Sequence, residues 1–194
     1  LSLEHLLSTF IHLFKSNNFQ LKDFLKFLDK AKMTFNIKRY AREKIILTLA
    51  ISVYNKYTTY LKDSEEIDFD DMLIEAKNSV DNFGFFHRVK YIIIDEYQDT
   101  SPVRFDLIKS ILDKTNSSLV VVGDDFQSIY RFTGCDLSLF LNFKKIFPKG
   151  KILKIQNTYR NSQELIKIAG DFVMKNKKQI KKKLKSGKSL KKPI

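Results

Sequence analysis

The 194-residue sequence predicts an α/β fold with parallel strands, preceded by an α-helical module. Two apolar runs, residues 89–94 and 119–122, are rich in β-branched side chains and are typical of buried parallel strands. A helical pattern that begins at Pro102 lies between them, and a strand, helix, strand order favours a right-handed parallel crossover. Both apolar runs end in carboxylates, so we expect ligands at the carboxyl ends of the strands, where open α/β sheets bind them.

The helical module is expected over residues 1–85, where apolar residues recur with helical spacing. Asp68 or Asp70 is a suitable N-cap for the last helix of this module, and the neighbouring acids suit its positive end. The module carries almost no catalytic chemistry. The expected helices span residues 3–15, 21–33, 37–61 and 72–80.

The α/β part is expected over residues 86–174. Beyond the second strand, the pattern predicts a helix over residues 137–147 and a third strand over residues 151–155. Ser162 is a suitable cap for a final helix. The Lys-rich tail, residues 175–194, is expected to be poorly ordered unless partners bind it.

The composition favours polyanionic partners. Lys and Arg outnumber Asp and Glu by 35 to 22, which gives a formal charge of +13, although much of the excess lies in the tail. Cys135 is the single cysteine, so no intrachain disulfide can form and a reducing, cytoplasmic location is expected. No apolar stretch is long enough for a membrane span, and a first residue other than Met indicates an excised fragment.

The carboxylates after the first apolar run are candidates for metal and proton chemistry. Asp95 can hold a hydrated Mg²⁺, and Glu96 can polarise a water molecule toward a phosphorus atom. An isolated Asp-Glu pair can also simply end a strand and begin a turn. In a parallel crossover, however, Asp124 and Gln127 from the second strand end would share the same edge, which favours a nucleotide-hydrolysing site.

Three segments in the same order support this interpretation: residues 95–100 (Asp-Glu-Tyr-Gln-Asp-Thr), 122–134 and 157–162 (Asn-Thr-Tyr-Arg-Asn-Ser). Together they resemble motifs II, III and IV of the UvrD/Rep group of superfamily 1 DNA helicases. The run Tyr-Arg-Phe-Thr-Gly and the Thr-Tyr-Arg are most similar to the DNA helicase IV branch. The resemblance implies that residues 86–174 are the C-terminal part of the first RecA-like P-loop NTPase domain, that residues 1–85 are a 1B-like module, and that residues 175–194 lead toward a second motor domain.

The resemblance also implies a role for each matching residue at an ATP site. Asp95 would ligate Mg²⁺ through water with Glu96 beside it, and Glu96 would orient and deprotonate the attacking water. Gln127 would sense the γ-phosphate with an amide that both donates and accepts. Tyr159 would stack on the adenine, and Arg160 would bring a planar cation to the γ-phosphate.

A DNA site is implied next to Gln127. In the family an aromatic residue at the Phe132 position stacks on single-stranded DNA, and Tyr130 precedes it. A Phe taken alone is more often a core residue. The implied function is an ATP-dependent 3′-to-5′ DNA helicase acting on single-stranded and partially duplex DNA. Because the Walker A loop and motifs V and VI lie outside this sequence, the chain alone is expected to be inactive and to need the remainder of the helicase.

Two other functions remain open at this point. A metal-dependent nuclease could use the clustered acids, but it would leave Gln127, Tyr159 and Arg160 without a role. A non-catalytic basic module could bind nucleic acid through the +13 charge alone. The acids that the nuclease would use are Asp95, Glu96, Asp99, Asp124 and Asp125.

Overall fold

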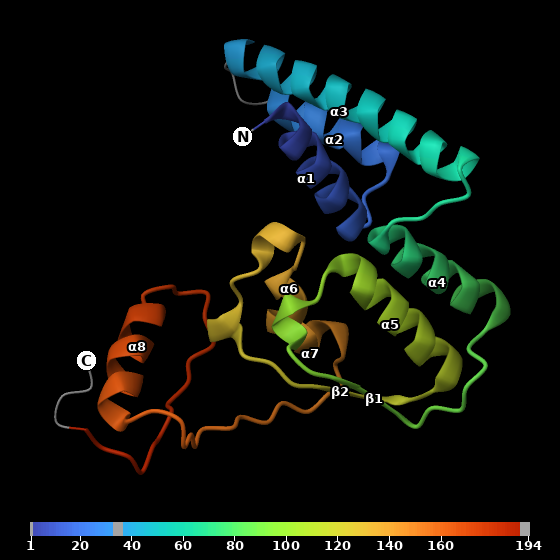
Figure 1. The fold of residues 1–194 in the computed structure, drawn as a ribbon. Coiled ribbons are helices and arrows are strands. Elements are labelled where there is room, and N and C mark those ends of the chain that lie inside the picture. The colour runs from blue at the N-terminus through green and yellow to red at the C-terminus, as the bar shows by residue number, and fades with distance from the viewer. Residues whose placement is uncertain (1, 33–36, 191–194) are drawn as a thin grey trace.

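The computed structural model describes residues 2–32 and 37–190 (Figure 1). The predicted α/β class is confirmed: the chain is mostly helical, and two strands form a small parallel sheet. None of the described helices has both the length and the apolar composition needed to cross a membrane. The longer helices are α1 (Leu3–Ser16), α2 (Leu21–Lys32), α3 (Ile37–Asp63), α4 (Phe69–Phe83), α5 (Pro102–Thr115) and α8 (Gln163–Val173).

The first three helices form a layer of their own (Figure 1). The Ser2 hydroxyl caps α1 by accepting a hydrogen bond from the His5 amide at 3.2 Å. The core of this layer is aromatic: the Phe14 and Phe24 rings stack with centroids 4.5 Å apart, and both side chains are buried. The four predicted helices of the module are confirmed, although Met33, the predicted end of the second helix, lies outside the described residues.

Helix α4 connects this layer to the sheet, because it packs along α5 and also contacts α1. The predicted cap is confirmed as a full capping box, in which Asp68 accepts from the Asp71 amide and Asp71 accepts from the Asp68 amide. The ammonium group of Lys15 lies 2.7 Å from an oxygen of each carboxylate. The start of α4 is therefore fixed to the end of α1.

The two strands, β1 (Tyr91–Ile94) and β2 (Ser118–Val121), pair in parallel with Ile94 opposite Val121. Helix α5 makes the crossover, as predicted. Ser101 caps its start, and Asn116 ends it in the left-handed conformation with φ 53°.

One face of this sheet remains open. Ile92, Ile94, Leu119 and Val121 are half-buried, whereas Tyr91, Ile93 and Val120 on the other face are exposed. The sequence indicated fully buried strands, because an all-parallel sheet normally has both faces covered. Among the described residues only one face is covered, so only every second strand residue is shielded from water.

The predicted third strand over residues 151–155 is wrong. A strand needs backbone partners, and among the described residues no backbone–backbone hydrogen bond involves this segment. Its alternating apolar side chains lie in solvent, with Leu153 90% exposed. The predicted helix over residues 137–147 is interrupted at Asn142, which separates α6 (Leu137–Leu141) from α7 (Phe143–Ile146).

The described part of the Lys-rich tail makes specific contacts with the rest of the chain. Ser162 caps α8 as predicted, by accepting from the Leu165 amide. The chain then turns back, Asn157 forms a parallel bridge with Lys185, and the Gln163 side chain accepts from the Ser186 amide at 2.9 Å. These contacts hold the segment 180–188 against the chain that enters α8.

Candidate functional site

The carboxyl ends of β1 and β2 meet at one edge of the sheet, as the crossover predicts. The Val122 amide donates to the Ile94 carbonyl at 2.8 Å, and the Tyr97 amide donates to the Val122 carbonyl at 2.9 Å. The loops that carry Asp95 and Asp124 therefore leave the sheet side by side. Gln156, which follows the segment 151–155, is not at this edge because that segment does not form a strand of the sheet.

Glu96 has an unusual backbone conformation. It is exposed and lies in the left-handed region, with φ 49° and ψ 41°. The Asp95 carboxylate accepts a hydrogen bond from its amide at 2.9 Å, and a short 3-10 turn over residues 97–99 follows. A non-glycine residue in this region costs about 1–3 kcal/mol and is typical of functional sites. The turn directs the Glu96 carboxylate into solvent at the sheet edge.

Gln98 joins the two loops, and the sequence analysis missed it. Its side chain is 1% exposed. Its amide nitrogen donates to Glu96 Oε2 at 2.8 Å, and its amide oxygen accepts from the Asp124 backbone N–H at 3.0 Å. A polar residue two positions after a catalytic candidate was the only sequence signal, because its second partner is 26 residues away.

Gly123 leaves the space that Gln98 occupies. A Cβ atom at this position would lie 2.6 Å from the Gln98 amide oxygen and 2.9 Å from the Phe140 ring. The absence of a side chain at Gly123 therefore permits the close approach of the two loops.

Asp124 links Gln127 to the Lys-rich tail. Its carboxylate accepts from the Gln127 side-chain amide at 3.1 Å and forms an ion pair with Lys182. Burial raises the pKa of Asp124, but the hydrogen bonds from Lys182, Gln127 and the Phe126 amide outweigh burial and leave that pKa below its ordinary value. The structure thus connects Glu96, Gln98, Asp124 and Gln127 by successive hydrogen bonds.

The tail covers Asp125, which is fully buried. Its carboxylate pairs with Lys182 and accepts from the Ile180 amide at 2.7 Å. The Lys182 ammonium also lies 4.3 Å from the centroid of the Phe126 ring. Asp125 is therefore a docking point for the tail and is not available to solvent.

The Asp99 carboxyl group has a different environment from those of Asp124 and Asp125. One of its carboxylate oxygens is buried and has no hydrogen-bond partner among the described residues. Burial, and then the nearby Glu96 carboxylate, raise the pKa of Asp99. The five acids of the nuclease alternative thus have different environments, and no group of three or more ligand-type side chains suited to a metal ion occurs in the described part of the chain.

The aromatic pair after Gln127 is accessible. Tyr130 is exposed, Phe132 is 69% exposed, and their ring centroids are 6.1 Å apart. The alternative that Phe132 is a core residue is wrong. Exposed aromatic rings of this kind can stack on unpaired bases.

The loop that carries these rings is anchored at several points. The His12 Nε2 atom lies 3.2 Å from the Thr133 carbonyl oxygen, and the Cys135 thiol donates to the Asp99 carbonyl at 2.9 Å. Gly134 has φ 82°, and a Cβ there would lie 2.8 Å from Ser16 Cβ. The loop is therefore fixed both to α1 and to the turn after Glu96.

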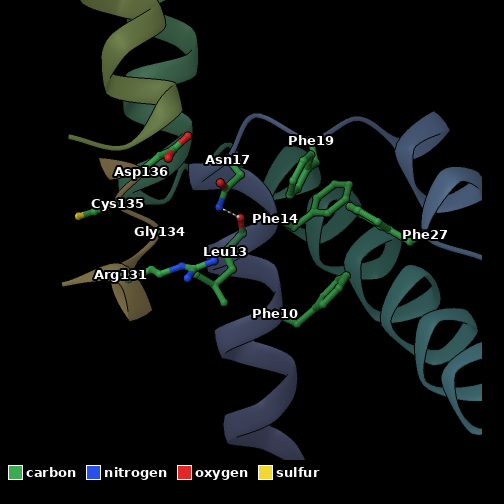
Figure 2. A pocket seen from close by; sticks show the side chains of 10 residues that line it. All are labelled: Phe10, Leu13, Phe14, Asn17, Phe19, Phe27, Arg131, Gly134, Cys135 and Asp136. Carbon is green, nitrogen blue, oxygen red and sulfur yellow. Dashed lines mark hydrogen bonds between the residues drawn. The ribbon is translucent and has the colours of Figure 1, made fainter. Parts of the chain in front are cut away.

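A groove of about 580 Å³ runs between α1 and this loop. Figure 2 shows aromatic side chains on one side of it and the Arg131 guanidinium reaching toward Leu13 from the other. The groove is separate from the Glu96 edge, since its lining residues do not include the strand ends. The lining residues are Phe10, Leu13, Phe14, Asn17, Phe19, Phe27, Arg131, Gly134, Cys135 and Asp136.

Tyr159 and Arg160 are not joined to the other predicted site residues. Both are exposed, and the Arg160 backbone amide donates to the Thr158 hydroxyl at 3.4 Å. Among the described residues, no hydrogen bond or ion pair connects either side chain to Asp95, Glu96 or Gln127.

Acidic and amide side chains at the carboxyl ends of parallel strands are typical of nucleotide-binding α/β proteins. The comparison with known families makes this class specific: the UvrD/REP helicase N-terminal domain matches residues 2–148. The chain therefore belongs to the UvrD/REP helicase family, and its two parallel strands with the helix between them are part of the RecA-like fold of the N-terminal domain.

Several proteins named as DNA helicases or as a probable DNA helicase homologue are similar to the chain. The ATP-dependent DNA helicase Rep of Buchnera aphidicola (Acyrthosiphon pisum) is 36% identical over 137 residues, which is 68% of this chain and 21% of that protein. The ATP-dependent DNA helicase PcrA of Bacillus subtilis is 32% identical over 64% of this chain and 17% of its own length. A probable DNA helicase II homologue of Mycoplasma capricolum is 29% identical over 91% of this chain and 27% of its own length. The chain thus spans about a fifth of the length of these relatives.

The residues at the sheet edge fit a Mg²⁺ ion that arrives with a nucleotide. Mg²⁺ is usually held by one or two carboxylates, water and substrate phosphates. Asp95 provides an exposed carboxylate whose orientation is fixed by the Glu96 amide. Asp124 is less suitable, because Lys182 and Gln127 already occupy its oxygens.

Proposed function

We propose that the chain is part of an ATP-dependent DNA helicase that moves 3′ to 5′ along single-stranded DNA. The observation that carries this proposal is the hydrogen-bonded series from Glu96 through Gln98 and Asp124 to Gln127. This series joins a carboxylate and a side-chain amide at the carboxyl ends of two neighbouring parallel strands, which supports the assignment of Glu96 as the base. Phosphoryl transfer needs such positioned polar groups more than covalent participation by the protein.

The chemistry follows from the individual side chains. Glu96 would accept a proton from the attacking water, and its exposure gives that water access. Asp95 would hold Mg²⁺, which neutralises the phosphate charge. Gln127 has one side-chain N–H on Asp124 and retains its amide oxygen for a water or its second N–H for the γ-phosphate.

We infer that Tyr159 and Arg160 complete the ATP site in the whole protein. Both side chains are exposed and carry no described contact that would have to break. They follow the segment 151–155, which lacks a strand partner among the described residues. Pairing of that segment with the rest of the protein would fix their positions, with Tyr159 on the adenine and Arg160 on the γ-phosphate.

The DNA track would begin at Tyr130 and Phe132. Stacking contributes roughly 1–3 kcal/mol per base without reading sequence, which suits a translocating motor. Gln127 lies three residues before Tyr130, so a change at the γ-phosphate can reach the stacking rings through one short loop. Single-stranded and partially duplex DNA are the proposed substrates.

The proposed division of the chain follows from this function. Residues 1–85 would be a 1B-like module, residues 86–174 the C-terminal part of the first motor domain, and residues 175–194 the path to the second. The open face of the sheet supports the need for further protein, because Tyr91 and Ile93 are exposed there. The chain alone would be inactive without the phosphate-binding loop and later motifs.

Two finer assignments also belong to the proposal. We propose that the chain is nearest the DNA helicase IV branch of the family, and the Tyr-Arg-Phe-Thr-Gly run supports this proposal. The single cysteine, whose thiol is buried and hydrogen-bonded, favours a reducing, cytoplasmic location.

Glu96→Gln in the full-length protein tests the proposal. We expect ATP hydrolysis to fall by about 10²–10⁴-fold, the usual contribution of a general base, while DNA binding stays within twofold. A full-length protein that binds DNA but lacks any ATPase would support the non-catalytic basic module instead. Metal-dependent DNA cleavage without ATP would support the nuclease.

A further inference from the structure

We propose that Gln98 is a positioning residue that holds the Glu96 carboxylate in place relative to Asp124 and Gln127. This inference rests on the proposed ATPase function. In this role, the buried Gln98 amide keeps Glu96, the proposed base, in a fixed position relative to Gln127, the proposed phosphate sensor on the other loop.

The chemistry of its partners fixes the orientation of the Gln98 amide. The Glu96 carboxylate can only accept a hydrogen bond, and the Asp124 backbone N–H can only donate one. The amide nitrogen therefore faces Glu96 at 2.8 Å and the amide oxygen faces Asp124 at 3.0 Å. A flipped amide would lose both bonds. Because the side chain is buried, water cannot replace them.

Glu96 depends on this contact. Its side chain is exposed, its backbone is left-handed, and Gln98 supplies the one hydrogen bond described for its carboxylate. The bond engages Oε2 alone, so Oε1 remains free to accept a proton from water. A carboxylate held at one oxygen has few orientations left, and a general base requires such alignment.

The oxygen of the Gln98 amide is connected to Gln127, the proposed phosphate sensor, through Asp124. Gln98 accepts from the backbone of Asp124, whose carboxylate accepts from the Gln127 side chain at 3.1 Å. A shift of Gln127 on phosphate release can therefore pass through Asp124 to the orientation of Glu96. A residue that only joined the two loops would need the Asp124 bond but not the Glu96 bond.

Gln98→Glu separates these two roles in the full-length protein. Once ionised, a carboxylate at this position still accepts from the Asp124 N–H, but it cannot donate to Glu96 and repels it. The protonated acid could donate to Glu96 as the amide does, so kcat is compared at a pH high enough to ionise the new carboxyl group. We expect kcat for ATP hydrolysis to fall at least about tenfold, out of the roughly 10²–10⁴-fold that a general base supplies. We expect KM for ATP, and the affinity for a fluorescent ATP analogue, to stay within about twofold.

Two further variants make the comparison specific. Gly123→Ala displaces the amide from the other side, because the new Cβ would lie 2.6 Å from its oxygen, and we expect the same loss of kcat. Ser117→Ala is the matched control. The Ser117 hydroxyl donates to the Val89 carbonyl at 2.7 Å and so joins the same two chain segments at the opposite ends of the strands. The kcat of Ser117→Ala should match that of the unaltered protein.

The outcomes distinguish this inference from the proposed function. Absence of ATPase in the unaltered full-length protein refutes the proposed function. An active protein in which folded Gln98→Glu or folded Gly123→Ala retains full kcat overturns the role of Gln98 alone. Loss of kcat with unchanged ATP affinity in both variants, together with a normal Ser117→Ala, supports it.

Discussion

Replacement of Lys182 by Met tests the docking of the tail onto the candidate site. The Lys182 side chain is 18% exposed and pairs with Asp125, which is completely buried, and with Asp124, which is partly exposed. Removing one partner of a buried ion pair costs about 3–5 kcal/mol. In Lys182→Met, Asp124 can still be hydrated and the Ile180 amide still donates to Asp125. Because this partial exposure weakens the effect, we expect the free energy of tail docking to fall by about 2–3 kcal/mol.

Hydrogen exchange at the Ile180 amide measures this cost directly, since that N–H is bonded only while the tail is docked. A loss of about 2–3 kcal/mol predicts exchange roughly 30- to 150-fold faster, at 1.4 kcal/mol for each tenfold change. Lys183→Met is the control, because Lys183 is exposed next to Lys182. Equal protection in Lys182→Met and in the unaltered chain would refute the ion-pair argument.

The same contact gives the tail a defined dependence on pH. The pKa of Asp124 is lower in the folded chain than its ordinary value of 3.8, so its contribution is present above that value. The contribution is lost as the pH falls through the lowered pKa, when the carboxyl group takes up a proton. The protection of the Ile180 amide against hydrogen exchange should therefore decline in acid. In Lys182→Met this protection should decline less, because the ion pair with Asp124 is already absent.

Three further changes test other parts of the structure. Lys15→Met leaves Asp68 without its buried cation and should reduce the free energy of unfolding by about 3 kcal/mol in urea titrations. Burial lowers the pKa of Lys15, but the hydrogen bonds that its ammonium group donates to Asp68 and Asp71 outweigh burial and leave that pKa raised, while the pKa of Asp68 is lowered. The difference between the two chains should therefore persist at neutral pH and shrink in acid as Asp68 protonates. Gly134→Ala should destabilise the chain by about 1–3 kcal/mol, since φ at this position is 82° and the added Cβ would clash with the Ser16 side chain. Phe132→Leu should weaken binding of single-stranded DNA by roughly 1–3 kcal/mol in fluorescence titrations, with no loss of stability because the ring is exposed.

Each of these expectations can fail in a recognisable way. A cost below about 1 kcal/mol for Lys15→Met would mean that the ion pair behaves like a surface pair. An unchanged melting temperature for Gly134→Ala would place the loop away from α1. Equal DNA affinity in Phe132→Leu and Tyr60→Leu, a change of an exposed ring on α3, would remove the stacking role.

The sequence was sufficient for the features that near neighbours control. The caps at Asp68 and Ser162 each depend on residues within a few positions. The two parallel strands follow from apolar runs with a helix between them. The meeting of Asp95 and Asp124 at one edge follows in turn from that crossover.

The segment 151–155 shows where such reasoning stops. Its alternating pattern favours a strand, but a strand also needs a partner with free backbone groups. Periodicity describes one segment at a time and does not specify that partner. Tyr159 and Arg160, which follow this segment, consequently stay apart from the other site residues.

The amino-acid sequence by itself determined the family, the helices with their caps and the acidic strand ends, because each depends on residue types at short, fixed spacings. Only the tertiary structure showed that Gln98 bridges Glu96 and Asp124, and that Lys182 pairs with acids 57 and 58 residues before it. One amide among many, and one lysine in a run of lysines, carry no local signal. Their roles are set by which loops the folded backbone brings within hydrogen-bonding distance.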